Sequence, residues 1–159
     1  MWRLRRDRQR QTRLLTAAGL ALAAGTLVYL TDRVGARSLL LPTVAALADR
    51  QWFGVLGGWL PSFFHPFAFS LLTAAVLPPT SAPRYLVCVG WGLVNLMFEV
   101  GQHPRLSGPL AAVLPTDIGN YFVRGTFDFG DLVAIVFGTL TAVVFLRLVQ
   151  PSLETRHAP

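Results

Sequence analysis

Residues 14–30 read LLTAAGLALAAGTLVYL, a run of 17 residues without a charged side chain. This run approaches the ~20 apolar residues that a helix needs to cross the hydrocarbon core of a bilayer. The chain around it has 159 residues, of which 53% are hydrophobic and 14% are charged, whereas a soluble domain is about 25% charged. An integral membrane protein is therefore the expected class. The composition excludes intrinsic disorder, a coiled coil and a collagen-like fibre.

Three further apolar blocks follow the first one, over residues 63–77, 85–98 and 132–146. With their flanks, the four blocks predict an all-α fold, a four-transmembrane-helix bundle with spans at about 14–31, 62–78, 84–102 and 129–149. The membrane domain is expected over residues 14–150, between a basic arm at 1–13 and a tail at 151–159. Small residues share one face of the first and of the fourth span, which favours close helix packing; they are Ala17, Ala21, Gly25, Gly138 and Ala142.

The charged residues indicate how the bundle is oriented. Residues 1–13 contain six arginines against Asp7, and the chain has no lysine, which excludes a Schiff-base or P-loop lysine. A basic arm directly before an apolar run is more typical of membrane orientation than of nucleic-acid binding. With the N-terminus inside, nine arginines lie on the cytoplasmic side and five outside, so both termini are expected in the cytoplasm. The first block is expected to be an uncleaved anchor, because Asp32 and Arg33 separate it from small residues.

The connections between the spans differ in character. Residues 32–61 are too apolar for a plain loop, and with Trp52, Phe53 and Trp59 they predict short interfacial helices between the first and second spans. Residues 77–83, rich in proline, predict an inner turn. Residues 103–127 are expected to form a polar outer loop.

A few polar residues stand near the expected outer ends of the spans. On the third span Asn95, Glu99 and Gln102 follow i, i+4, i+7 spacing, which places them on one helical face. The predicted topology brings six residues to the outer interface as a candidate polar cluster: His65, Glu99, Gln102, Arg124, Asp128 and Asp131.

Each member of this cluster also has a structural interpretation. Asp128 and Asp131 have the spacing of a helix capping box, and Glu99 has Arg124 as a potential ion-pair partner. His65 would be a first-turn polar residue, and Asn95 would form an interhelical hydrogen bond. These interpretations remain open beside the chemical ones.

In a chemical role, Glu99 and the two aspartates would supply general acid and base, with His65 as proton carrier. Arg124 would grip a phosphate or a carboxylate. No spacing rule supports a metal site, Cys88 alone cannot build one, and no cofactor is predicted.

The order of these residues resembles the VanZ-like family of small four-helix membrane proteins, named for a teicoplanin-resistance protein. In that family a His opens the second span, E-x-x-Q closes the third and R…D-x-x-D opens the fourth, followed by a glycine; here these are the six cluster residues and Gly138. The resemblance covers about residues 60–146. The chain departs from the family pattern at Ile135, in place of Asn, and at Pro61 and Ser62, in place of Asp-Lys.

The resemblance implies a protein of the bacterial cytoplasmic membrane that acts on or near cell-envelope precursors. The first hypothesis is therefore that the cluster binds or modifies an anionic lipid-linked or cell-wall substrate on the extracytoplasmic side. The second is a non-enzymatic accessory subunit of a larger membrane complex, in which the cluster locks the helices together. Transport is the weakest hypothesis, because no charged residue lies in the middle of an expected span.

Overall fold

A computed structural model describes residues 2–32, 52–78 and 83–149 of the chain, and all regular structure in these ranges is helical. The helices are α1 (Trp2–Asp32), α3 (Val55–Val76), α4 (Pro83–Gly101), α5 (Pro104–Val113), α6 (Thr116–Arg124) and α7 (Phe129–Val149). The interfacial helices expected between the first two spans lie outside the described residues.

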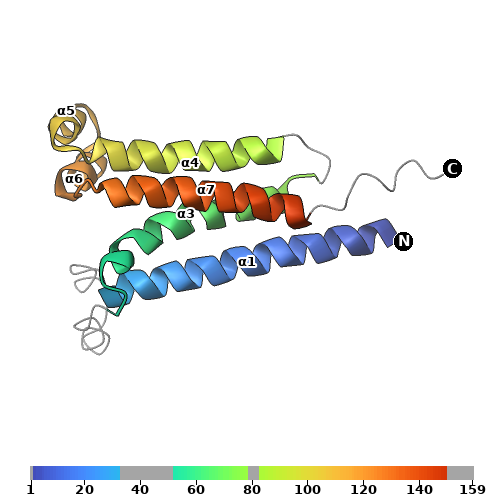
Figure 1. Ribbon diagram of the computed structural model, residues 1–159. Helices are drawn as coiled ribbons and strands as arrows, with labels where there is room; N and C mark the ends of the chain where they lie inside the picture. The colour runs from blue at the N-terminus through green and yellow to red at the C-terminus, as the bar shows by residue number, and fades with distance from the viewer. Residues whose placement is uncertain (1, 33–51, 79–82, 150–159) are drawn as a thin grey trace.

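The four long helices pack side by side, and α3 is central because it contacts α1, α4 and α7 (Figure 1). Helix α4 also packs against α7. The start of α1 and the end of α7 lie at the same end of the bundle, while α5 and α6 lie at the other end (Figure 1). The two ends are called the N-terminal end and the α5–α6 end below.

In the part of the chain that the structure describes, three helices are long and apolar enough to cross a membrane: Asp7–Asp32 within α1, Val55–Val76 and Phe129–Val149. The chain is thus a helical membrane protein, as its composition predicts. Helices α4 and α7 occupy nearly the residues expected for the third and fourth spans. Helix α1 begins at Trp2, so the basic arm continues the same helix and does not form a separate segment.

Helix α3 begins at Val55, which corrects the expected start of the second span at residue 62. The helix includes Pro61 and Pro66, whose missing N–H groups interrupt the hydrogen-bond ladder. His65 is thus the eleventh residue of α3, and the prediction that it opens the second span is wrong.

Small residues allow the long helices to approach closely. A Cβ atom on Gly25 would lie 3.1 Å from Cβ of Phe64, which brings α1 against α3. A Cβ atom on Gly138 would collide with the carbonyl oxygen of Phe63, so the backbones of α7 and α3 are in contact there. Together with the buried Ala21 and Ala142, these contacts confirm the predicted packing role of the small residues.

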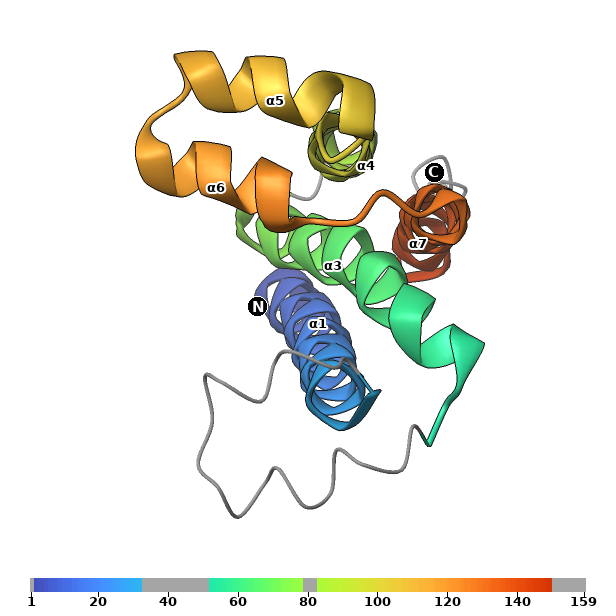
Figure 2. The same ribbon diagram turned by 90° about the vertical axis from the view of Figure 1, so that its left-hand side faces the viewer.

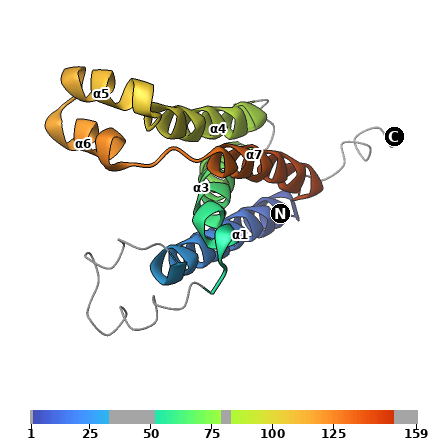
Figure 3. The same ribbon diagram turned by 60° about the vertical axis from the view of Figure 1, so that its left-hand side comes forward.

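Residues 103–127 contain two helices, so the prediction of a polar outer loop is wrong. The His103 side chain accepts a hydrogen bond from the Arg105 N–H at 3.2 Å, and Pro104 stands at the first helical position, which starts α5. Figure 2 shows α5 and α6 side by side. They meet where Gly119 lies against Ala111, and Phe122 of α6 packs on Gly101 at the end of α4. The short segment 125–128 then connects the end of α6 to the start of α7 (Figure 3).

Candidate functional site

The first turn of α7 is capped by the side chain of Asp128. Its Oδ1 atom accepts a hydrogen bond from the N–H of Gly130 at 2.7 Å, and its carbonyl oxygen accepts one from the N–H of Asp131 at 3.1 Å. A carboxylate at this position is favoured by the positive end of the helix dipole. The predicted capping role of Asp128 is therefore confirmed.

Helix α4 contributes Glu99 to the same helix start. Glu99 is only 7% exposed, and its Oε1 atom accepts a hydrogen bond from the backbone N–H of Asp128 at 2.8 Å. In a capping box this N–H would bond to the third helical residue, Asp131. Here a residue from another helix accepts it, so Glu99 ties the end of α4 to the start of α7.

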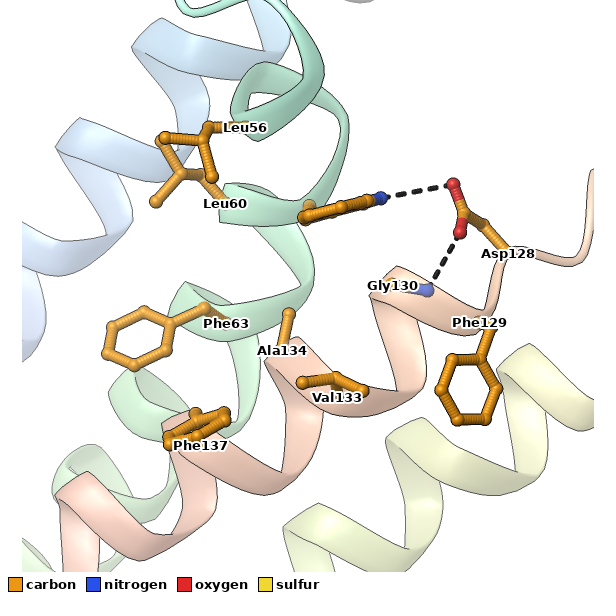
Figure 4. A pocket seen from close by; sticks show the side chains of 10 residues that line it. Leu56, Leu60, Phe63, Asp128, Phe129, Gly130, Val133, Ala134 and Phe137 are labelled. Atoms are coloured by element: carbon orange, nitrogen blue, oxygen red, sulfur yellow. Dashed lines mark hydrogen bonds between the residues drawn. The ribbon is translucent and has the colours of Figure 1, made fainter.

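Helix α3 reaches the same point through Trp59. The indole Nε1–H donates to Oδ2 of Asp128 at 3.1 Å, drawn as a dashed line in Figure 4. The indole ring lies against Gly130, where any Cβ atom would collide with it. The Asp128 carboxylate therefore accepts hydrogen bonds from Trp59 of α3 and from Gly130 of α7. The backbone N–H of Asp128 donates to Glu99 of α4.

An apolar pocket lies between α3 and α7 beside this junction (Figure 4). Its volume is about 560 Å³. Asp128 is the only charged residue among those that line it, which are Leu56, Trp59, Leu60, Phe63, Asp128, Phe129, Gly130, Val133, Ala134 and Phe137. A pocket of this size with one polar group at one end suits a ligand that is mostly apolar.

A second polar contact ties α4 to α6. The Gln102 side chain is buried, donates from Nε2 to the Tyr121 hydroxyl at 3.0 Å and lies against Gly125. Arg124 directly precedes Gly125, at the end of α6. Its side chain is exposed and makes no ion pair with Glu99 among the described residues, so the predicted pair between the two is wrong.

The remaining predicted residues take separate positions. Asp131 is buried and lies in the first turn of α7. Asn95 donates to the carbonyl of Trp91 at 2.8 Å, within its own helix, which corrects the expected interhelical bond.

His65 is exposed and lies on α3, with its ring 6.0 Å from that of Phe69. Phe69 in turn stacks on Trp91 of α4 at 4.9 Å. Helices α3 and α4 run antiparallel (Figure 1). His65 precedes Phe69 by one turn of α3, so it lies closer than Phe69 to the Glu99 end of α4.

Of the six predicted residues, Glu99, Asp128 and Asp131 meet at the start of α7, and Gln102 and Arg124 lie beside the end of α6. Sequence reasoning missed Trp59 and Tyr121 as members of this site. One sequence signal pointed to Trp59, because Gly130 in the first turn of α7 leaves room for a ring. No such signal marked Tyr121, which is 49% exposed. Within the described ranges, no group of three His, Cys, Asp or Glu side chains could hold a metal ion.

Trp59→Phe is expected to keep the ring packed on Gly130 while removing the donor to Asp128. The unfolding free energy should fall by about 0.5–1.5 kcal/mol, the usual net contribution of one hydrogen bond. The unfolding free energy is measured by adding sodium dodecyl sulfate to the protein in mild detergent micelles. Trp91→Phe is the matched control, since it removes a bond to Thr73 of 3.0 Å that lies outside the site. No change in Trp59→Phe would contradict a role for this bond in closing the junction.

Comparison of the chain with protein-family models, with curated proteins and with solved structures finds no match.

Proposed function

We propose that this chain is a VanZ-like integral membrane protein that binds an anionic lipid-linked substrate, or a lipid-linked cell-wall precursor, at the α5–α6 end of the bundle. The observation that carries the proposal is the position of Asp128, which lines the apolar pocket and also belongs to the hydrogen-bonded junction. An amphiphilic ligand needs both environments side by side. Its hydrocarbon chain would fill the pocket between α3 and α7, and its polar group would lie at the junction.

The membrane topology is part of this proposal. We infer that α4 is a fourth span: it has 19 residues, or about 28 Å at 1.5 Å per residue, close to the ~30 Å hydrocarbon thickness. Four spans agree with the start of α1 and the end of α7 lying at the same end (Figure 1). The arginine distribution supports a cytoplasmic location for that end, in a bacterial cytoplasmic membrane. Helices α5 and α6, with exposed Val113, Ile118 and Val123, would then lie in the outer headgroup layer.

The polar residues have distinct roles in this proposal. Arg124 is the exposed cation beside the junction, and its guanidinium can hold a phosphate or carboxylate through two parallel hydrogen bonds. Glu99 and Asp131 would orient the bound group, and in a chemical step they would exchange protons with it. His65, which lies on α3, would carry the proton to or from these carboxylates.

A photoreactive polyprenyl phosphate with a diazirine in its chain tests the pocket. Ala134→Phe is expected to reduce labelling of the 133–137 segment about tenfold, because the added ring occupies the pocket that Ala134 lines. Val136→Phe is the matched control, since Val136 is exposed on the same helix and does not line the pocket. Labelling is measured by mass spectrometry of peptides. Equal labelling of both variants and the parent protein would contradict the proposal.

The same probe tests the headgroup site. Arg124→Gln should weaken labelling several-fold without lowering stability, because Arg124 is exposed. Arg105→Gln is its control, an exposed arginine on α5. If Arg105→Gln has the same effect, the attraction is general and not specific to Arg124.

A second candidate function is a non-enzymatic accessory subunit of a larger membrane complex. The bond between Glu99 and the Asp128 N–H favours it, because this bond links two helices without needing a ligand. A native mass spectrum of the protein extracted from its own membrane tests this candidate. A stoichiometric second polypeptide supports the subunit, and the chain alone with a bound polyprenyl lipid supports the first proposal.

A further inference from the structure

Among the described side chains, two arginines are buried at the N-terminal end of the bundle, far along the helices from the junction. Arg10 of α1 is 7% exposed, and Arg84 of α4 is fully buried. One N–H donor of Arg84, on Nη2, bonds to the carbonyl oxygen of Leu77 at the end of α3, at 2.6 Å. Three other guanidinium nitrogens are buried without a hydrogen-bond partner among the described residues: Arg10 Nη2, Arg84 Nε and Arg84 Nη1.

The charges at this end are not balanced by the described residues. Arg10 lies near the start of α1 and Arg84 is the second residue of α4, and both helices start at the same end of the bundle (Figure 1). Asp7, one turn before Arg10, is the acidic residue of this part of α1. Arg147 adds a third cation, with its guanidinium carbon 5.7 Å from the centre of the Tyr85 ring. Guanidinium groups keep their proton in proteins, and a buried charge without a partner is strongly destabilising. A further anion is therefore expected at the two buried arginines.

We propose that the phosphate group of an anionic phospholipid binds at the N-terminal end of the bundle, beside the starts of α1 and α4, where it accepts hydrogen bonds from Arg84 Nε and Nη1 and from Arg10 Nη2. The planar guanidinium fork matches phosphate oxygens in pairs. Basic pockets between membrane helices on the cytoplasmic side bind such headgroups. The position favours a lipid over a free ion, because the helices expose apolar side chains close to the two arginines, at Leu15 of α1 and Leu86 of α4. This site is independent of the proposed substrate site at the other end.

The thermal midpoint of the full chain in mild detergent tests the site without any variant. Phosphatidylglycerol at a hundredfold excess over its dissociation constant is expected to raise the midpoint by about 5–10 °C. Phosphatidylcholine, which has a phosphate but no net charge, and inorganic phosphate are expected to raise it much less. The absence of a shift with phosphatidylglycerol overturns the proposal. If inorganic phosphate raises the midpoint as much as phosphatidylglycerol does, the bound phosphate is a free ion and the lipid proposal is wrong.

Variants locate the site. Arg10→Gln and Arg84→Gln are each expected to weaken phosphatidylglycerol binding about tenfold, since each loses a charge-assisted hydrogen bond. Arg8→Gln is the matched control, an exposed arginine on the same helix as Arg10. Equal weakening in Arg8→Gln overturns the site in favour of a general surface charge effect. If Arg84→Gln fails to fold, Arg84→Lys keeps the charge and loses the fork, and it should bind several-fold more weakly than the parent.

The chain itself contains another carboxylate that follows α7 in sequence, Glu154. The variant Glu154→Gln distinguishes between two candidate partners of the buried arginines, the Glu154 carboxylate and a lipid phosphate. If the phosphate proposal holds, the variant keeps the midpoint of the parent and its full response to phosphatidylglycerol. A lowered midpoint, together with no response of the parent protein to the lipid, overturns the proposal and assigns Glu154 as the partner.

Discussion

Gly138→Ala is expected to lower the unfolding free energy by about 1–3 kcal/mol, although alanine is the better helix former by about 1 kcal/mol. The added methyl group would collide with the carbonyl oxygen of Phe63, a backbone atom that cannot rotate away. Helices α3 and α7 must then separate, and this loosens the wall of the pocket that both helices form. Reversible unfolding in detergent micelles, followed by tryptophan fluorescence, measures the change.

Two glycines provide matched controls for this experiment. Gly19 of α1 and Gly90 of α4 have no atom within 4 Å of an added Cβ. Their alanine variants are expected to be unchanged or slightly more stable, since only helix propensity changes. A loss of stability in Gly138→Ala and a gain in the two control variants would show that close packing, and not helix propensity, causes the loss. If Gly138→Ala is as stable as Gly90→Ala, the close approach of α3 and α7 is wrong.

Glu99→Leu is expected to lower the unfolding free energy by about 1.5–3 kcal/mol, the range for hydrogen bonds to charged groups. The variant leaves the Asp128 N–H without its acceptor and removes the hydrogen bond between α4 and the start of α7. Unfolding from detergent micelles measures the loss. Hydrogen exchange of the α7 first turn gives a local readout, because the Gly130 and Asp131 amides should exchange faster.

Glu99→Gln is the matched control, because its amide oxygen can still accept from the Asp128 N–H while the charge is removed. We expect Glu99→Gln to lose less than about 1 kcal/mol of stability. If glutamine destabilises as strongly as leucine, the negative charge and not the hydrogen bond holds the junction. If Glu99→Gln is stable and also labels normally with the polyprenyl probe, Glu99 is a structural lock alone.

Much of the helical architecture could be predicted from the sequence. Charge-free runs and their arginine flanks predicted the membrane class and placed α4 and α7 to within one residue of the observed bounds. Asp128 was identified as a helix cap from its spacing to Asp131, which depends on residues within one turn. The start of α3 was misplaced, because the apolar block was taken to begin at Phe63 and His65 was taken as a first-turn residue, whereas the helix begins at Val55.

The candidate site was predictable only in part. Glu99, Asp128 and Asp131 were expected at one end of the bundle. The bond from the Asp128 N–H to Glu99 was not expected, because Arg124 was the predicted partner of Glu99. The helices in 104–124 were also missed. Both helices are short, and proline or glycine residues interrupt their sequences. They are held by contacts such as Gly101 with Phe122, which the sequence pattern does not display.

The sequence by itself determined the class of protein, the approximate helices and the helix cap, because apolar runs and capping depend on residues close together in the chain. The tertiary structure alone decided the junction, the pocket and the buried arginines. The bond from Asp128 to Glu99 joins residues 29 apart, and that from Trp59 to Asp128 joins residues 69 apart. Such contacts exist only where two helices cross at a particular height and rotation. That geometry is set by close packing at residues such as Gly138, not by the charge or spacing of the partners.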